Sequence, residues 1–425
     1  MVEQESGAAM FSADFKERAF PVYAAMREKG PVVGITLPTG EPMWFVTRYA
    51  EVVAFLKDDE RFANSPSSAL TDDEYAQLFQ QATEHLTVEQ QQMAAQTDEI
   101  LRRNLLAVDP PDHSRLRRLV AIPFTPKYIE GLRSRVQAIA DGLLDAVGSR
   151  ADGTGRREME LIGDFAYPLP LTVISEMLGI PFADRDKFRE WSQAAVSFTP
   201  ADRANPAVTA KLIEFIAYMR GLVADKRSNP GDDLLSGLVL AEAEGDKLSE
   251  NELLSMIFVL IVAGHETTVN LIANGTLALF EHPEQRARLR ENPELLRSAI
   301  EEMLRYYGPV EMSLTRWVRE DTELGGQRLR RGDQMLAVLA SANHDGEQFP
   351  NPDVFDISRE PNRHIAFGTG IHSCLGATLA RLEGQIAFAT LLSRMPDLAL
   401  AIPRDEVRWR DATFLRGLTR LPVVF

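Results

Sequence analysis

The chain has 425 residues, of which 45% are hydrophobic and 25% are charged, and its formal net charge is −16. This composition is ordinary for a globular protein. The acidic charge disfavours nucleic acid and anionic membrane surfaces as partners. The single cysteine excludes disulfides within the chain and Cys-rich zinc sites.

No targeting or spanning segment is evident in the sequence. Residues 1–9 have neither the basic nor the apolar segment of a secretory signal. The longest strongly apolar run, residues 256–263, is shorter than the about 20 residues needed to cross a bilayer. No repeat, low-complexity tract or Pro/Ser-rich linker is present. We therefore expect a cytoplasmic protein with no membrane anchor and a single domain over residues 1–425.

The first part of the chain is predicted to be mostly helical. Residues 43–60 are typical of a short strand followed by a helix. A polar, glutamine-rich helical stretch lies between residues 64 and 106. Residues 128–254 keep a helical pattern that is broken by turns.

A long central helix comes next. Ser249 with Glu252 forms a capping box, and the helix should end at His282-Pro283. About 30 residues is longer than a usual globular helix, so we expect it to cross the whole domain. Gly264 stands in its interior, where glycine costs about 1 kcal/mol relative to alanine.

After this helix the pattern changes. Residues 293–308 form another helical segment, and residues 314–340 contain β-rich pieces around the turns Gly325-Gly326 and Arg331-Gly332. A β-like segment covers residues 416–425. The fold is therefore predicted to be mainly α with small β-sheets.

The cysteine, Cys374, lies in the segment FGTGIHSCLG, residues 367–376. A lone free cysteine is usually an inert buried thiol. Here Gly368, Gly370 and Gly376 permit positive φ angles and the close approach of a flat ligand. A helical pattern begins at the next residue, so the sulfur lies at a helix N-terminus, where amide dipoles stabilise a thiolate. Such a thiolate is what a haem iron needs as an axial ligand.

This segment resembles the haem-ligand signature FGxGxHxCxG of the cytochromes P450, the haem-thiolate monooxygenases. The resemblance implies that Cys374 binds the iron of haem b (iron protoporphyrin IX), that His372 binds a propionate and that Phe367 packs near the thiolate. It also implies the family's single triangular, α-rich domain, with the haem between the long central helix and the Cys-ligand helix. The matching positions are Phe367, Gly368, Gly370, His372, Cys374 and Gly376.

The middle of the long helix carries the sequence AGHETT, residues 263–268. Because polar residues follow an apolar run, at least one polar group should be buried. A polar patch on a partly exposed helix is one alternative. Half of an HExxH zinc motif is another, but Val269 stands where the second histidine is required, which excludes it.

This stretch resembles the oxygen-binding motif (A/G)Gx(D/E)TT of the same family. The resemblance implies that Gly264 loosens the helix to admit O₂ and water. It further implies that Glu266 and Thr267 are the catalytic acid–alcohol pair, which delivers protons through a hydrogen-bonded chain. His265 should point elsewhere.

Two further sets of charged residues match family positions. Glu302 and Arg305 share a helix face, and alone such a pair is worth only tenths of a kcal/mol. The resemblance to the family's ExxR helix implies a structural lock with Arg359. For the haem propionates it implies the cations His113, Arg117, Arg316 and His372.

The substrate is the least determined feature. By position in the resemblance, the pocket residues are apolar, so we expect a hydrophobic substrate such as a fatty acid, terpenoid, steroid or polyketide. The long 64–106 segment, and Asn343-His344-Asp345 in place of an Asn-Arg-Asp turn, leave pocket shape and substrate class open. The expected pocket residues are Val259, Ala263, Gly264, Val310, Met312 and Phe414.

The resemblance implies a monomeric monooxygenase that inserts one oxygen atom from O₂ into a small molecule by hydroxylation or epoxidation. No flavin or iron–sulfur domain is fused to it, so electrons should come from NAD(P)H through a separate ferredoxin or flavodoxin and its reductase. Arg115 and Arg118 are expected to be solvated and to dock this donor. The alternatives are an H₂O₂-using peroxygenase, which the Glu266–Thr267 pair argues against, and a non-catalytic haem-binding or gas-sensing protein.

Overall fold

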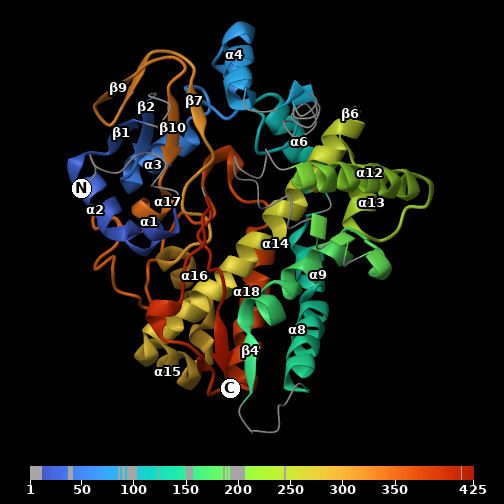
Figure 1. The fold of residues 1–425 in the computed structure, drawn as a ribbon, viewed down its shortest axis with the longest axis vertical. Coiled ribbons are helices and arrows are strands. Elements are labelled where there is room, and N and C mark those ends of the chain that lie inside the picture. The colour runs from blue at the N-terminus through green and yellow to red at the C-terminus, as the bar shows by residue number, and fades with distance from the viewer. Residues whose placement is uncertain are drawn as a thin grey trace. The chain divides into compact units, whose positions relative to one another are not determined.

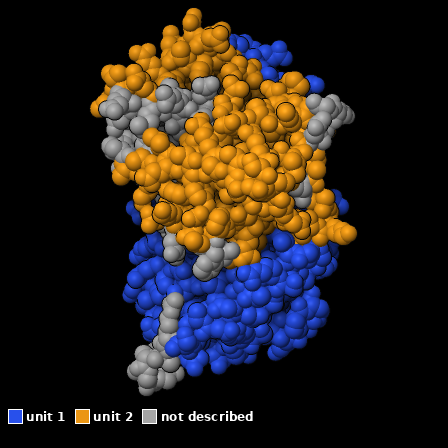
Figure 2. Space-filling view, turned by 90° about the vertical axis from the view of Figure 1, so that its right-hand side faces the viewer, with its two compact units in different colours: residues 1–62, 130–170, 267–425 blue, residues 63–129, 171–266 orange. Residues whose placement is uncertain are grey.

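The computed structural model divides into two compact units (Figure 2). Unit 1 comprises residues 1–62, 130–170 and 267–425, and unit 2 comprises residues 63–129 and 171–266. The single domain expected over residues 1–425 stays a prediction. Within these bounds, the structure describes residues 12–36, 42–84, 87–88, 91–92, 103–122, 124–149, 157–184, 187–188, 190–191, 206–243, 246–412 and 414–425.

Unit 1 contains a five-stranded sheet in the order β1-β2-β10-β7-β3. Strand β2 pairs antiparallel with β1 and parallel with β10, which pairs antiparallel with β7. Gly34 lies opposite Trp44, and a Cβ there would come within 2.9 Å of the indole, so glycine leaves room for this ring. The strands are β1 (Val32–Thr36), β2 (Pro42–Val46), β3 (Phe62–Ala63), β7 (Arg316–Val318) and β10 (Gln334–Ala337).

Two smaller sheets belong to the same unit. The hairpin β8 (Thr322–Leu324) and β9 (Gln327–Leu329) turns at Gly325-Gly326, with φ angles of 56° and 80°. This confirms the turn expected there, since consecutive positive φ angles favour glycine. The other sheet has the order β11-β12-β4 and consists of β4 (Glu158–Glu160), β11 (Ala399–Leu400) and β12 (Pro422–Val424).

The helices of unit 1 form two groups: α17 packs against α2 and α3 beside the five-stranded sheet, and α18 is the centre of the other group. Helix α18 lies against α8 and α16 (Figure 1). A Cβ at Gly275 would come within 2.7 Å of Phe388 and 2.8 Å of Met303, so glycine allows α14 to approach α18 and α16 closely. The helices are α1 (Ala13–Glu17), α2 (Ala19–Lys29), α3 (Tyr49–Lys57), α8 (Arg133–Gly148), α15 (Pro283–Glu291), α16 (Leu296–Tyr306), α17 (Leu339–Ala342) and α18 (Ala377–Arg394).

Unit 2 is almost entirely helical in the part that the structure describes. Helix α12 packs against α13, and α6 packs against the short hairpin β5–β6. The glutamine-rich stretch begins with helix α4, while its segment 93–102 lies outside the described residues. The elements are α4 (Asp72–Thr83), α6 (Asp112–Ala121), α12 (Pro206–Ser228), α13 (Leu234–Leu240), β5 (Glu242–Ala243) and β6 (Asp246–Lys247), with α7 (Pro126–Gly131) and α9 (Pro168–Met177) crossing the unit boundary.

The long helix α14 spans Glu250–Glu281, which is 32 residues, and the unit boundary falls inside it. Its capping box is formed as expected: the Ser249 N–H donates to Glu252 at 2.8 Å, and the Glu252 N–H donates to Ser249 Oγ at 3.4 Å. Among the described residues it is the one helix long and apolar enough to cross a membrane, and 61% of its most apolar stretch is buried inside the protein. A core helix meets the same criterion.

A buried charge cluster connects three distant parts of unit 1. Lys16 Nζ lies 2.5 Å from Glu311 Oε2, and Arg416 Nη1 lies 3.1 Å from Glu311 Oε1. None of the three side chains is more than 3% exposed. Lys16 and Arg416 also donate to the carbonyl oxygens of Leu415 and Lys16, respectively. Buried charges need this degree of pairing to be tolerated.

Candidate functional site

The loop around Cys374 is fixed by its own backbone. The Cys374 N–H donates to the carbonyl oxygen of Phe367 at 2.9 Å, and the Gly368 N–H donates to that of Ile365 at 2.9 Å. Gly370 has a φ of 75°, and a Cβ there would lie 2.6 Å from the Leu56 carbonyl oxygen at the end of α3. A turn of this shape accepts only glycine at that position.

The Cys374 thiol is exposed at the end of this loop. A short turn, Gly370–His372, precedes it. Helix α18 begins at Ala377 rather than at Leu375, where the sequence pattern places its start. Gly376 is the residue before the helix, and a Cβ on it would meet nothing within 4 Å. Cys374 therefore precedes the helix by about one turn.

Two of the expected propionate partners lie in unit 1. Arg316 is on β7, is 2% exposed, and donates to the Phe55 carbonyl oxygen at 3.0 Å. Its guanidinium carbon lies 5.5 Å from the centre of the Phe55 ring. His372 is half-buried in the turn that precedes Cys374.

The other two lie on α6 in unit 2. His113 is buried, and Arg117 is half-buried one turn further along. On the same helix, Arg115 is ion-paired with Glu252 and, at 3.3 Å, with Asp246. The expectation that Arg115 is solvated is therefore wrong, because acidic groups from α14 and β6 already neutralise it, and its role in docking stays a prediction.

The AGHETT segment remains regular α-helix throughout. The local loosening expected at Gly264 is therefore not seen, and a Cβ there would make ordinary contact with Ile174 at 3.5 Å. Glu266 is 4% exposed, which confirms the expected burial of a polar group. Thr267 is half-buried. His265 is fully buried and donates from Nδ1 to the Ile261 carbonyl oxygen at 2.7 Å, so it has a structural role in the helix.

A buried acid on α18 was not expected from the sequence. Glu383 is 1% exposed and accepts a hydrogen bond from the Thr268 hydroxyl on α14. Its second carboxyl oxygen is buried and has no partner among the described residues. Burial raises the pKa of Glu383 to about 8, although the Thr268 hydrogen bond acts in the opposite direction.

The structure brings the ExxR pair and Arg359 together. Arg305 binds Glu302 through two hydrogen bonds of 2.8 Å, and Arg359 Nε lies 3.2 Å from both carboxyl oxygens. Arg305 also donates to the carbonyl oxygens of Asn343 and Pro352. Glu302 and Arg305 are fully buried.

A second charged group adjoins the cysteine loop. Arg381 on α18 binds Glu301 through two hydrogen bonds of 2.7 Å, and His364 Nε2 lies 2.9 Å from Glu301. The Arg381 guanidinium carbon lies 4.4 Å from the centre of the Phe367 ring. No sequence signal singles out this group. Arg381, Glu301 and His364 belong neither to the ExxR pair nor to the fixed positions of the cysteine signature.

The expected pocket residues belong to both units. In unit 2, Val259 and Gly264 are half-buried and Ala263 is exposed on α14. In unit 1, Val310 bridges to Leu415, while Met312 is 1% exposed in a hydrophobic cluster against which Phe414 packs. Their role in substrate binding stays a prediction.

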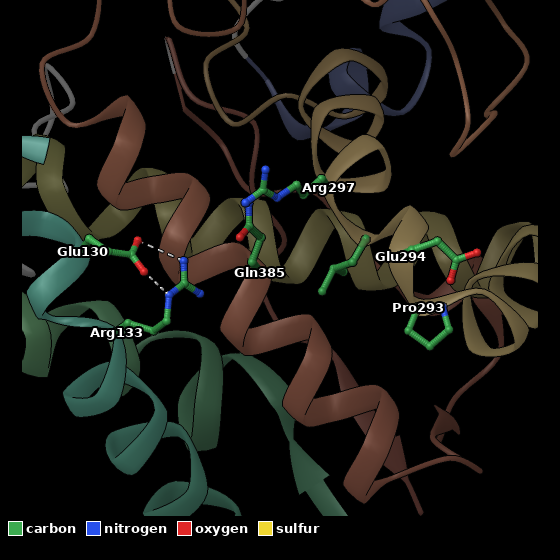
Figure 3. Close-up of a pocket in the computed structure, with 7 residues that line it drawn as sticks. Glu130, Arg133, Pro293, Glu294, Arg297 and Gln385 are labelled. Carbon is green, nitrogen blue, oxygen red and sulfur yellow. Dashed lines mark hydrogen bonds and ion pairs between the residues drawn. The ribbon is translucent and has the colours of Figure 1, made fainter.

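A separate surface hollow of about 510 Å³ lies in unit 1 (Figure 3). Arg133 and Glu130 pair across one side of it, and Gln385 of α18 and Arg297 of α16 lie at its centre. Because its two acids and two arginines balance in charge, the hollow has no evident preference for an ionic ligand. The lining residues are Glu130, Arg133, Pro293, Glu294, Leu296, Arg297 and Gln385.

The donor set in unit 1 fits a haem. The thiol is exposed on a loop held by backbone hydrogen bonds, which suits a ligand that must reach a metal in a fixed direction. A buried arginine, Arg316, and a histidine, His372, lie in the same unit and can bind anionic propionates. A cysteine loop of this build and an acid–alcohol pair on a long helix are features of haem-thiolate oxidoreductases.

Comparison with known proteins agrees with this class. The cytochrome P450 family model matches residues 60–396. The chain is 43% identical over 413 residues to the polyketide biosynthesis cytochrome P450 PksS of Bacillus subtilis, covering 96% of each chain. It is 44% identical over 411 residues to the cytochrome P450 monooxygenase PikC of Streptomyces venezuelae, covering 96% of this chain and 92% of that protein.

A solved structure gives the same result. The myxobacterial cytochrome P450 CYP267B1 in complex with myristic acid matches with a TM-score of 0.83 and 43% identity, covering 99% of both chains. The chain belongs to the cytochrome P450 family. It is an oxidoreductase, a cytochrome P450 monooxygenase, and family membership implies a haem-thiolate cofactor and the use of O₂. The expected mainly α fold is confirmed.

Proposed function

We propose that this monooxygenase inserts one oxygen atom from O₂ into a hydrophobic small molecule, using haem b bound through Cys374. The observation that carries the proposal is the loop that presents the exposed Cys374 thiol at a fixed backbone geometry. When bound, the haem would supply the redox chemistry by which O₂ is cleaved. The overall balance is substrate C–H, O₂, two electrons and two protons giving substrate C–OH and water.

The chain's own residues would manage charge and protons. Arg316 and His372 of unit 1 would neutralise the propionates, as would His113 and Arg117 of unit 2. The buried carboxyl group of Glu266 would pass protons to the Thr267 hydroxyl. The structural lock would hold the segment around residues 343–354 in place, and it consists of Glu302, Arg305 and Arg359.

The names of the relatives support a substrate class. PksS is named for polyketide biosynthesis, and CYP267B1 was solved with myristic acid. We therefore propose a polyketide or long-chain fatty acyl compound as the substrate. A spectral titration with myristic acid and with macrolide aglycones tests this, since a ligand that displaces iron-bound water shifts the haem to high spin.

Turnover separates the competing functions. We propose that electrons come from NAD(P)H through a separate ferredoxin or flavodoxin and its reductase. Product formed with NADH, a surrogate ferredoxin and its reductase, in the presence of catalase, supports the monooxygenase. Product formed with H₂O₂ alone would identify a peroxygenase, and absence of product with every donor and substrate tried would favour a gas sensor.

A further inference from the structure

We propose that Arg381 is a positioning residue that raises the electron affinity of the Cys374-ligated iron, and that Glu301 and His364 hold it in place for this role. The inference rests on the proposed haem ligation by Cys374. It concerns residues outside the ligand signature and outside the ExxR lock.

The first step is that Arg381 is rigidly held. Both oxygens of Glu301 accept hydrogen bonds of 2.7 Å from its guanidinium group, the two-point geometry that restricts an arginine most. Glu301 stays ionised, because hydrogen bonds from Arg381 and His364 outweigh the effect of burial and lower its pKa to about 2. Arg381 therefore faces a permanent anion.

His364 completes the clamp in one tautomer. Its Nδ1 accepts a hydrogen bond of 3.2 Å from the Ala366 N–H, so the proton of a neutral ring is on Nε2. Nε2 lies 2.9 Å from Glu301 Oε2, so the histidine donates this proton to the acid. The histidine ring is 3% exposed, and it anchors the acid to the segment that leads into the cysteine loop.

The second step is that Arg381 reaches the cysteine loop. Its guanidinium carbon lies 4.4 Å from the centre of the Phe367 ring, a cation–π contact. The carbonyl oxygen of Phe367 accepts the hydrogen bond from the Cys374 N–H at 2.9 Å. Arg381 thus contacts Phe367, the residue whose carbonyl oxygen holds the backbone of Cys374 in place. The pKa of Arg381 is raised mainly by its hydrogen bonds to Glu301, and the charge of Cys374 raises it further.

The third step is electrostatic. Reduction of a thiolate-bound ferric iron adds a negative charge to the site. A nearby guanidinium stabilises that charge, whereas the carboxylate of Glu301 opposes it. Arg381 is 37% exposed, so solvent screens part of its effect. Removal of the two charges should therefore move the reduction potential in opposite directions, which loss of a merely structural clamp would not do.

The test measures the reduction potential of the haem-loaded protein by spectroelectrochemistry. Arg381→Met should shift the potential to more negative values, and Glu301→Gln should shift it to more positive values. Arg381→Lys keeps the charge and should stay near the wild type. The double variant should lie between the two single variants.

Arg394→Met is the matched control. Arg394 lies on the same helix, is 35% exposed, and is paired with Asp145 at 2.5 Å, but it is 13 positions further along. Its removal should leave the potential unchanged. A shift equal to that of Arg381→Met would overturn the proposal, as would shifts of the same sign in Arg381→Met and Glu301→Gln.

Spectra of the reduced CO complex keep the outcomes separate. A wild type without the red-shifted Soret band of thiolate ligation refutes the proposed function itself. A wild type with that band but without opposite shifts refutes only the role of Arg381. If Arg381→Met loses haem, Glu301→Gln decides: a more positive potential supports the proposal, and an unchanged or more negative one overturns it.

Discussion

The Thr268 hydroxyl donates a hydrogen bond to the buried carboxyl group of Glu383, and this contact joins helix α14 to helix α18. Thr268 is 2% exposed, whereas its neighbour Thr267 is half-buried. The two adjacent threonines therefore have different surroundings. We therefore expect Thr268 to have a structural role, while the role of Thr267 in proton delivery stays a prediction.

This difference predicts how two variants will behave. Thr267→Ala should retain haem and substrate binding but consume NAD(P)H without matching product, releasing peroxide instead. Thr268→Val is the control: coupling should stay normal, while stability falls by about 1–3 kcal/mol because Glu383 loses its donor. The ratio of product to NAD(P)H consumed checks both. Full coupling in Thr267→Ala would contradict the assignment of the alcohol.

Glu383 should make stability depend on pH. Its pKa is about 8 in the folded protein and about 4.3 in the unfolded chain. At a pH between these two values, the carboxyl group is protonated in the folded protein and ionised in the unfolded chain. Its stabilising contribution is full below the lower value and is lost as pH rises through the upper one.

The checking measurement is urea unfolding of the wild type and Glu383→Gln over a pH series. The wild type should lose about 1.4 kcal/mol per pH unit relative to the variant between roughly pH 5 and pH 8, and the difference should level off above that. Parallel pH curves for the two proteins would show that Glu383 does not titrate in this way.

Replacement of the ligand should be visible in a single spectrum. The reduced, CO-bound wild type should show the red-shifted Soret band of thiolate ligation, and Cys374→His should show the histidine-ligated position. Since Cys374 is exposed and its loop is held by backbone contacts, the variant should still fold. An unchanged band in Cys374→His would remove Cys374 from the site.

Disruption of the ExxR lock should be costly. Arg305→Met leaves Glu302 without its two shortest hydrogen bonds in a fully buried place, and we expect a loss of about 3–5 kcal/mol. Arg359→Met should cost less, because its contacts to Glu302 are longer, at 3.2 Å. Unfolding free energies and haem content compare the two variants. Equal losses would show that Arg359 shares the lock fully.

The two arginines of α6 that are expected to dock the electron donor have different surroundings. Arg118 is exposed, whereas Arg115 is bound to Glu252 and Asp246. Arg118→Glu should raise the apparent KM for ferredoxin and weaken its salt dependence. Arg115→Leu should lower stability and leave that KM unchanged. A normal KM in Arg118→Glu would place the docking site elsewhere.

Local sequence patterns predicted much of the fold. The capping box at Ser249 and the paired glycines Gly325-Gly326 specify their structures through neighbouring residues alone, and both are formed. Strand β4, in a region predicted to be helical, was missed. Its three residues pair with β12, more than 260 positions away, and no local pattern contains that partner.

The site was predictable where a motif fixes spacing and unpredictable where packing decides the outcome. Cys374 and the acid of α14 stand out in the sequence. Glu383 does not, because an acid on a helix is usually solvated, and only the approach of Thr268 and the burial of α18 make it unusual. The prediction that Arg115 is solvated failed for the same reason: its acidic partners come from other elements.

The Lys16–Glu311–Arg416 cluster can form only late in synthesis of the protein, because its residues come from both ends of the chain. The Arg416 side chain binds the carbonyl oxygen of Lys16 across a separation of 400 residues. At a synthesis rate of about 5–20 residues per second, Lys16 leaves the ribosome roughly 20–80 s before Arg416. The Lys16 side chain therefore cannot be paired and buried in this cluster until translation is nearly complete, so the cluster forms only after almost the whole chain has been made.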